Sequence, residues 1–173
     1  MATSEREALR ERRERTVIEH MESENEHRFD VTMETFDHPR YELIATGEVH
    51  DGEEAVAAYF EETRAAFPDQ RNELIELHHS EDAVIVEANL RGTHRGPFRG
   101  LPPTGRSFEM RFCAIFVFEE ERLVCERVYF DANTILRQLG IARDPLTLGG
   151  RVLTVLNHPV TVGRAVARQI SGR

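Results

Sequence analysis

The chain has 173 residues, of which 40% are hydrophobic and 31% are charged, a balance typical of one globular domain with its own core. Its formal net charge of −9 argues against a main role in binding nucleic-acid phosphates or anionic lipid headgroups. No apolar run approaches the ~20 residues that span a bilayer, and the charged N-terminus lacks the apolar core of a signal peptide. These features predict a cytoplasmic protein that binds neither nucleic acid nor membrane.

Two helix starts are visible in the first third of the chain. Ser4 with Glu7, and Ser23 with Glu26, have the spacing of a capping box, in which the two side chains satisfy free N–H groups at a helix start. The pattern predicts one helix from Ser4 and a second helix over 24–36. The apolar residues of the second helix recur at helical spacing and are Phe29, Met33 and Phe36.

Strands follow a third predicted helix, which lies between Asp51 and Pro68 after a short strand at 41–44. The strand-like segments then come one after another, at 71–79, 83–95, 107–118 and 122–131. The third segment alternates most clearly, with Phe108, Met110, Phe112, Ala114, Phe116 and Phe118 on one face. Short turns between the segments indicate antiparallel pairing. The sequence therefore predicts an α+β fold with helices packed on one face of an antiparallel sheet.

The last part of the chain differs from the rest. A short helix predicted over 132–139 ends at Gly140, a common C-terminal cap. The segment 141–173 that follows carries valine, leucine and isoleucine at frequent intervals and is too apolar for a free tail. We therefore expect one domain over 1–140 and a C-terminal extension over 141–173 that docks on the core or on a dimer partner.

Four short motifs lie between residues 91 and 140. They are Gly92-Thr93-His94 with Gly96, Gly100-Leu101-Pro102-Pro103-Thr104-Gly105, Val128-Tyr129-Phe130-Asp131, and Leu136-Arg137-Gln138-Leu139-Gly140. In order and spacing these motifs resemble the SnoaL-like polyketide cyclase (ester cyclase) family, within the larger group built like nuclear transport factor 2 (NTF2). With the preceding helices, the resemblance covers residues 24–140.

The resemblance implies an NTF2-like cone, a curved antiparallel sheet wrapped by N-terminal helices around a pocket, commonly as a homodimer. In the cyclases, an aspartate near the end of the last strand is the general acid/base of an intramolecular aldol ring closure, without metal or organic cofactor. By position this residue is Asp131. The expected function is acid/base chemistry of the cyclase or isomerase type, with proton abstraction next to a carbonyl group of a small apolar substrate.

Asp131 has two interpretations. As a catalytic residue it would lie in an apolar pocket, where burial raises the pKa of a carboxyl group and allows proton exchange with a carbon acid near neutral pH. It also directly precedes the predicted helix 132–139, and aspartate is a preferred N-cap. A capping carboxylate accepts backbone N–H bonds that lower its pKa, which works against a base poised near neutrality.

Other polar side chains could accompany Asp131. Arg127, Tyr129 and Asp131 share one strand face, so all three would line the pocket if one does. Tyr129 could donate a hydrogen bond to an enolate, and Arg127 could bind a substrate carboxylate or pair with a glutamate. His94 could be a second proton carrier or a satisfied core histidine.

Weaker candidates for the pocket wall are His27 and His78. His78 and His79 are adjacent on a strand, so one faces inward and the other outward, and the alternation leaves open which one. The spacing of the histidines demands no metal, and no metal site is predicted. Met110 and Phe112 belong to the apolar stripe of their strand and could also contact a substrate.

Two alternatives remain open. A non-catalytic NTF2-like binding module would hold a lipid-like or aromatic molecule in the same pocket. An isomerase or epoxide hydrolase would be another enzyme on this fold, although the Asp-Arg-Asp arrangement of the hydrolase type is absent around Asp131. A dry cavity with no titratable group pointing inward would favour the binding module.

Overall fold

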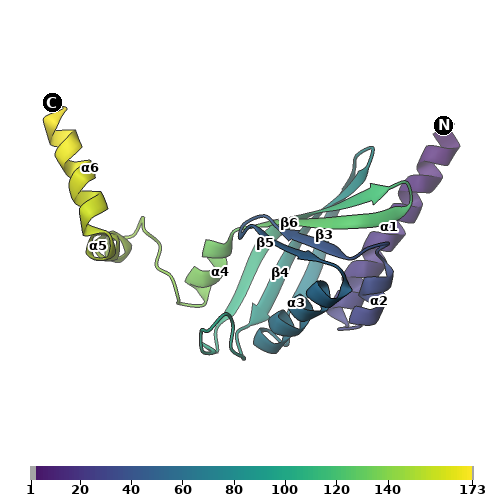
Figure 1. Ribbon diagram of the computed structural model, residues 1–173, viewed down its shortest axis with the longest axis horizontal. Helices are drawn as coiled ribbons and strands as arrows, with labels where there is room; N and C mark the ends of the chain where they lie inside the picture. Colours follow the sequence, from purple (N-terminus) through teal and green to yellow (C-terminus); the bar gives the residue numbers. More distant parts are fainter. Residues whose placement is uncertain (1–2, 173) are drawn as a thin grey trace.

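The computed structural model describes residues 3–172 and folds them into six helices and one six-stranded sheet (Figure 1). The helices are α1 (Thr3–Asn25), α2 (Phe29–Glu34), α3 (Glu53–Ala66), α4 (Ala132–Gln138), α5 (Leu148–Asn157) and α6 (Pro159–Ser171). The strands are β1 (Arg40–Leu43), β2 (Glu48–Asp51), β3 (Arg71–His79), β4 (Ala83–Thr93), β5 (Ser107–Glu119) and β6 (Arg122–Phe130). None of these helices is long and apolar enough to cross a membrane. The predicted α+β class is confirmed.

One curved sheet holds all six strands, in the order β2-β1-β6-β5-β4-β3. The four long strands β3 to β6 pair antiparallel, as the short turns between them predict. β1 lies parallel to β6 and antiparallel to β2, so the complete sheet is mixed. β2 has no counterpart among the predicted strands, and it forms the edge of the sheet next to β1.

The N-terminal helices differ from the prediction at Ser23. α1 continues through this residue because the Ser23 hydroxyl donates back to the carbonyl of His20, at 2.9 Å, instead of capping a new helix. The helix ends shortly before His27, which adopts a left-handed conformation with φ 59°. The predicted helix over 24–36 is therefore reduced to the short α2.

The core lies between the inner face of the sheet and the first three helices, which Figure 1 shows together at one end of the molecule. The alternation predicted for β5 is confirmed, because all six residues of its apolar face are buried. Burying one such large side chain contributes about 1.5–3 kcal/mol relative to leaving it exposed. The face of β5 therefore fixes which side of the sheet the helices cover.

A β-bulge in β6 reverses the faces of its last residues. Pairing with β5 skips Val124, since its neighbours Leu123 and Cys125 pair with Phe118 and Val117, which are consecutive. Because side chains alternate along a strand, one extra residue exchanges inward and outward positions beyond it. The bulge therefore separates β6 into two parts with opposite phase.

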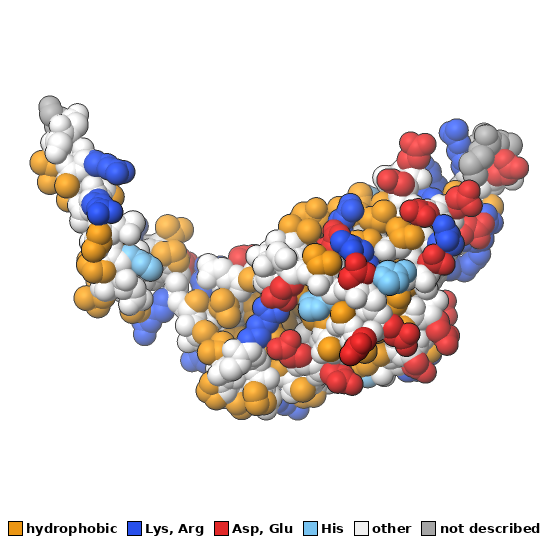
Figure 2. All heavy atoms as spheres, in the orientation of Figure 1, with side chains coloured by type: hydrophobic (Ala, Val, Ile, Leu, Met, Phe, Trp, Pro, Cys, Tyr) orange, Lys and Arg blue, Asp and Glu red, His pale blue; other side chains and the backbone are white. Residues whose placement is uncertain are grey.

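The extension after α4 stands apart from the domain. α5 and α6 pack against each other, and Figure 1 shows both well away from the sheet. Their apolar side chains are exposed, and Figure 2 shows them as a hydrophobic surface on this arm; they include Leu148, Val152, Leu156, Val160 and Ile170. The apolar side chains of α5 and α6 are therefore not packed against the core of the same chain. Docking on a partner subunit stays a prediction.

Candidate functional site

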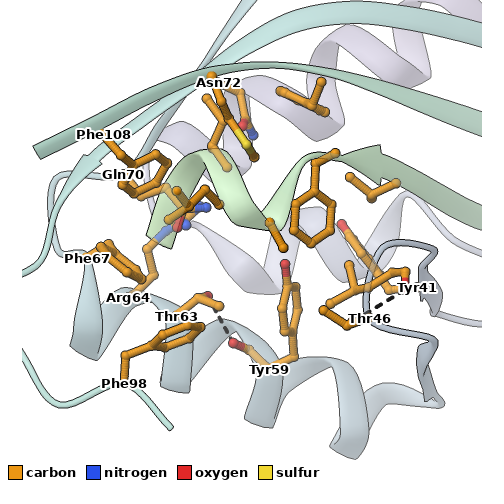
Figure 3. A pocket seen from close by; sticks show the side chains of 18 of the residues that line it. Tyr41, Thr46, Tyr59, Thr63, Arg64, Phe67, Gln70, Asn72, Phe98 and Phe108 are labelled. Atoms are coloured by element: carbon orange, nitrogen blue, oxygen red, sulfur yellow. Dashed lines mark hydrogen bonds between the residues drawn. The ribbon is translucent and has the colours of Figure 1, made fainter. Parts of the chain in front are cut away.

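A cavity of about 300 Å³ lies between α3, the end of α1 and the inner face of the sheet (Figure 3). Most of its wall is aromatic or aliphatic, and the apolar lining includes Phe60, Phe67, Leu90, Phe98, Phe108, Met110, Phe112, Val128, Phe130 and Ile135. A few polar side chains interrupt this wall, chiefly Glu24, Tyr41, Tyr59, Arg64, Asn72 and Glu126. The predicted pocket is therefore present, and titratable groups line it.

Four buried side chains in this wall, His20, Glu24, Tyr41 and Glu126, form what we call the carboxylate–histidine cluster. His20 Nε2 lies 2.6 Å from the Tyr41 hydroxyl and 3.2 Å from Glu126 Oε2. The Tyr41 hydroxyl donates to Glu24 Oε1 at 2.9 Å, and the Asn72 amide donates to Glu24 Oε2 at 2.7 Å. Apart from its contact with His20, Glu126 Oε2 has no hydrogen-bond partner within residues 3–172.

The helical repeat of α1 brings half of this cluster into the core. Val17, His20, Met21 and Glu24 are spaced at i, i+3, i+4 and i+7, so they share the buried face of the helix. The other ring nitrogen of His20, Nδ1, is held 2.8 Å from the Thr35 hydroxyl, which fixes the orientation of the ring. β1 supplies Tyr41, and the inward phase of β6 beyond its bulge supplies Glu126.

The cluster gives its two carboxyl groups different proton affinities. Burial raises the pKa of Glu126, and the negative charge of Glu24 adds to this effect. Burial also disfavours the charge of Glu24, but the hydrogen bond and charge of His20, the charge of Arg64 and the hydrogen bond from Tyr41 together outweigh it and lower that pKa. For His20 burial acts against protonation, yet Glu126 and Glu24 together raise its pKa to about 9. At neutral pH the cluster therefore contains a protonated histidine and an ionised Glu24, beside a carboxyl group at Glu126 whose pKa is raised.

Two polar groups from α3 also reach the cavity. Figure 3 shows Tyr59 rising from the helix toward the middle of the pocket and Arg64 reaching the part of the wall that holds Gln70. Burial raises the pKa of Tyr59, so its hydroxyl stays protonated and can donate a hydrogen bond. The site thus contains a candidate proton acceptor, a candidate hydrogen-bond donor and a cation.

Arg127, Tyr129 and Asp131 share one face of the chain, as their spacing predicts, but it is the outer face. Beyond the bulge Glu126 is inward, whereas Arg127 pairs with Glu42 at 2.9 Å on the outer face and Tyr129 is 43% exposed. Neither Arg127 nor Tyr129 lines the cavity. A substrate-binding role for these two side chains stays a prediction, without support from their position.

Asp131 is exposed and caps α4. Its Oδ1 accepts the backbone N–H of Asn133 at 2.9 Å, and its Oδ2 accepts the Thr134 hydroxyl at 2.6 Å. The hydrogen bond from Thr134 is the main reason that the pKa of Asp131 is lowered. These contacts match the N-cap interpretation. The acid/base role of Asp131 stays a prediction, without support from its position.

His94 is fully buried but lies outside the cavity lining. Its ring packs on Phe67, with ring centroids 5.3 Å apart, and its Nδ1 accepts the backbone N–H of Thr104 at 3.2 Å. Because Nδ1 accepts, a neutral ring carries its proton on Nε2, which has no partner among the described residues. The motif residues His94 and Thr104 thus anchor a loop to the core. A proton-transfer role for His94 stays a prediction.

The remaining predicted residues divide into two groups. His27 and His78 are exposed, and His78 lies 3.7 Å from Glu76 on the outside of β3. Met110 and Phe112 line the cavity, although their contact with a substrate stays a prediction. Of the eight residues proposed from sequence, only these two apolar ones lie in the cavity wall.

The polar residues that do line the cavity left one signal in the sequence. His20 and Glu24 occupy positions of an otherwise apolar helical stripe, and ionisable groups on such a stripe must be paired or functional. Glu126 left no such signal, because only the bulge turns it inward. Arg64 likewise becomes notable only once its burial is known.

Three members of the cluster could also ligate a divalent metal ion. One donor atom each from His20, Glu24 and Glu126 lies within 4.8 Å of the others, and imidazole with carboxylates is a common ligand set. A metal would have to displace the proton that His20 holds up to about pH 9 and the hydrogen bonds of Tyr41. The same geometry is already a connected hydrogen-bonded set for proton transfer.

Comparisons with known proteins agree with this fold. Residues 15–139 match the family model of the SnoaL-like polyketide cyclase. None of the curated proteins compared matches the chain significantly. Among solved structures, IdmH from Streptomyces antibioticus, described as "a putative polyketide cyclase", is 28% identical with a TM-score of 0.64, and the match covers 74% of this chain and 98% of that chain.

Two more distant structures show the same architecture. A "putative SnoaL-like polyketide cyclase" from Jannaschia sp. CCS1 is 21% identical, with a TM-score of 0.68 over 77% of this chain and 94% of that chain. A Catenulispora acidiphila protein with a ketosteroid isomerase-like fold is 17% identical, with a TM-score of 0.62 over 73% of this chain and 92% of that chain. The predicted NTF2-like fold is confirmed, and the extension beyond residue 140 lies outside the family match.

Proposed function

Because the chain belongs to the SnoaL-like polyketide cyclase family, we propose that it catalyses proton transfer at a carbon next to a carbonyl group, without a cofactor. The reaction would be of the cyclase or isomerase type, and the substrate a small molecule with a mostly apolar body. We assign the acid/base role to Glu126 rather than to Asp131.

The observation that carries this proposal is the state of Glu126. Its carboxyl group is buried in the cavity wall, burial raises its pKa, and one of its oxygens has no partner in the described chain other than His20. A general base works best when its pKa approaches the ambient pH, because it is then both ionised and basic enough to accept a proton. An exposed N-cap such as Asp131 has its pKa shifted in the opposite direction.

The proposed step balances with groups that the cavity contains. Ionised Glu126 accepts a proton from the carbon next to the carbonyl, and the C–H electron pair becomes the enolate. The Tyr59 hydroxyl is the candidate donor to the enolate oxygen. In a cyclase the enolate carbon then attacks a second carbonyl of the same molecule, and Glu126 returns its proton to the new alkoxide. In an isomerase the proton returns to a different carbon.

Hydrogen–deuterium exchange tests this assignment without knowledge of the natural substrate. The probe is 2-tetralone, a bicyclic apolar ketone, whose exchange next to the carbonyl in D₂O is followed by proton NMR. We expect the wild-type chain to accelerate exchange over buffer and Glu126→Gln to lose about 100-fold or more of this acceleration, since general-base catalysis contributes about 10²–10⁴. Asp131→Asn should stay near the wild-type rate.

Loss of exchange in Asp131→Asn, with exchange retained in Glu126→Gln, would return the acid/base role to Asp131.

A non-catalytic binding module is the second candidate function, favoured by the predominance of apolar side chains in the wall. Binding of the ketone, seen by saturation-transfer NMR, with no acceleration of exchange by the wild type would favour that module and exclude proton transfer on this ketone.

A further inference from the structure

Arg64 carries a buried guanidinium that is only partly hydrogen-bonded. Only 8% of the residue is exposed, yet it forms no salt bridge with any carboxylate of the described chain. Its Nη2 donates to the backbone carbonyl of Glu24 at 3.3 Å, and its Nε has no hydrogen-bond partner within residues 3–172. Arginine is always charged and has five N–H donors, so a buried guanidinium with open donors is costly unless a partner satisfies it.

Part of the Arg64 side chain borders the cavity. The residue lines the wall together with Asn72, and Figure 3 shows its side chain extending from α3 into the pocket. The ring of Phe29 packs against the guanidinium, whose carbon lies 5.5 Å from the ring centroid. The charge of Arg64 contributes to lowering the pKa of Glu24, yet no salt bridge joins the two side chains within residues 3–172, and the Glu24 oxygens accept hydrogen bonds from Tyr41 and Asn72.

The cavity contains a second arginine that serves as a comparison. Arg99 also lines the wall, but both of its terminal nitrogens donate to the carboxylate of Glu48, one of them at 2.6 Å. The Glu48 carboxylate therefore already occupies the edge of the Arg99 guanidinium formed by its two terminal nitrogens, where a ligand carboxylate could otherwise bind. Of the two arginines in the lining, only Arg64 lacks a salt bridge within the described residues.

We propose that Arg64 binds a carboxylate of the ligand, which makes the natural substrate a carboxylic acid with a mostly apolar body and a carbonyl group. The planar guanidinium matches the geometry of a carboxylate, and charge-assisted hydrogen bonds in a water-poor cavity are strong. The aromatic wall holds the apolar body of the ligand. The inference rests on the proposed function for the reaction at Glu126, whereas the carboxylate subsite itself does not require that reaction.

A matched pair of fluorescent probes tests the subsite by binding alone. The probes are 2-naphthylacetate and the neutral 2-naphthylacetamide, which have nearly the same shape. The chain contains no tryptophan, so naphthalene fluorescence is measured without an indole background. We expect the wild type to bind the acid about 10- to 100-fold more tightly than the amide, the range of hydrogen bonds to charged groups. Arg64→Gln should abolish this preference and leave amide binding unchanged, whereas Arg99→Gln should keep it.

Equal affinity for the two probes in the wild type, or an undiminished preference in Arg64→Gln, would overturn the proposal. Circular dichroism and thermal melts verify that each variant is folded. If Arg64→Gln does not fold, Arg64→Lys replaces it, because lysine keeps the positive charge but cannot donate two parallel hydrogen bonds to a carboxylate. We then expect a smaller preference for the acid over the amide. An undiminished preference in Arg64→Lys would contradict the inference. Glu126→Gln should retain the preference, so loss of exchange activity there does not affect the subsite.

Discussion

Within the carboxylate–histidine cluster, contacts and not residue type decide the behaviour of each glutamate. Glu24 and Glu126 are both buried and both lie near His20. Burial disfavours the charge of both, but the contacts of Glu24 with His20, Arg64 and Tyr41 outweigh burial and lower its pKa. For Glu126, burial together with the charge of Glu24 outweighs the contact with His20, and its pKa rises. Two titratable groups with pKa values pushed apart are typical of acid/base sites, which agrees with assigning proton transfer to Glu126.

His20 should make the stability of the fold depend on pH. Its pKa of about 9 in the folded state exceeds the ordinary 6.5, so folding strengthens proton binding. This stabilisation is complete below pH 6.5 and is lost as the pH rises through 9; at ~1.4 kcal/mol per pKa unit it amounts to roughly 3 kcal/mol. We expect the free energy of unfolding, from urea titrations, to fall across this interval.

The variant His20→Gln should flatten that pH dependence, because glutamine binds no proton in either state. His78→Gln replaces an exposed histidine and serves as the control that should keep it. If the wild type and His20→Gln lost stability equally between pH 6.5 and 9, the stabilising role of the protonated ring would be refuted.

Among the helices and strands, the sequence predicts the buried face of an element wherever a regular spacing of apolar residues determines that face. β5 was predictable residue by residue, since each side chain on its apolar face is buried. The extra residue in β6 was not, because a bulge depends on how two strands pair and leaves the composition of the strand unchanged. The start predicted at Ser23 failed for a related reason, since a serine within a helix can bond backward to a carbonyl. The candidate site depends on the bulge, so sequence predicted its apolar wall better than its polar groups.

A close approach between the loop after β4 and the end of α3 explains the motif glycine Gly96. The N–H groups of Arg95 and Gly96 both donate to the carbonyl of Ala66, and a Cβ at position 96 would lie 2.0 Å from the Ala65 carbonyl oxygen. Gly96→Ala should therefore lower the free energy of unfolding by about 1–3 kcal/mol, the usual cost of overpacking.

A helical glycine provides the control for this prediction. A Cβ at Gly163, in α6, would meet nothing within 4 Å, so Gly163→Ala should be neutral or slightly stabilising, because alanine favours helix over glycine by ~1 kcal/mol. Thermal melts of the two variants compare the effects directly. Equal melting temperatures would refute the role of Gly96 as a contact glycine.

At the scale of the whole molecule, charge is distributed unevenly. Residues 141–173 contain five arginines and one aspartate, whereas the complete chain has a net charge of −9. Figure 2 shows acidic side chains concentrated on the domain, far from the arm formed by α5 and α6. A cationic arm with exposed apolar residues and an acidic domain are complementary, which supports the prediction that the extension of one copy docks on a second copy.

A variant that ends at residue 142 tests this prediction. We expect the full chain to be a dimer and the shortened chain a monomer in light scattering coupled to size-exclusion chromatography. Leu156→Asp, which places a charge on the exposed apolar side of α5, should also weaken the dimer, and high salt should do so by screening the charges. A full chain that is monomeric, or a truncated chain that stays dimeric, would contradict the docking role.

The bulge at Val124 decides which side chains in the second half of β6 face the cavity. Deleting that residue would remove the bulge and leave Glu126 inward, because Leu123 and Cys125 already pair with consecutive residues of β5. Pairing Val124 in an unbroken ladder would instead turn the guanidinium of Arg127 and the phenol of Tyr129 toward the hollow in place of Glu126, with no substitution at any of the three positions. One irregular pairing, more than the identity of the residues beside it, therefore selects the chemistry that this strand offers.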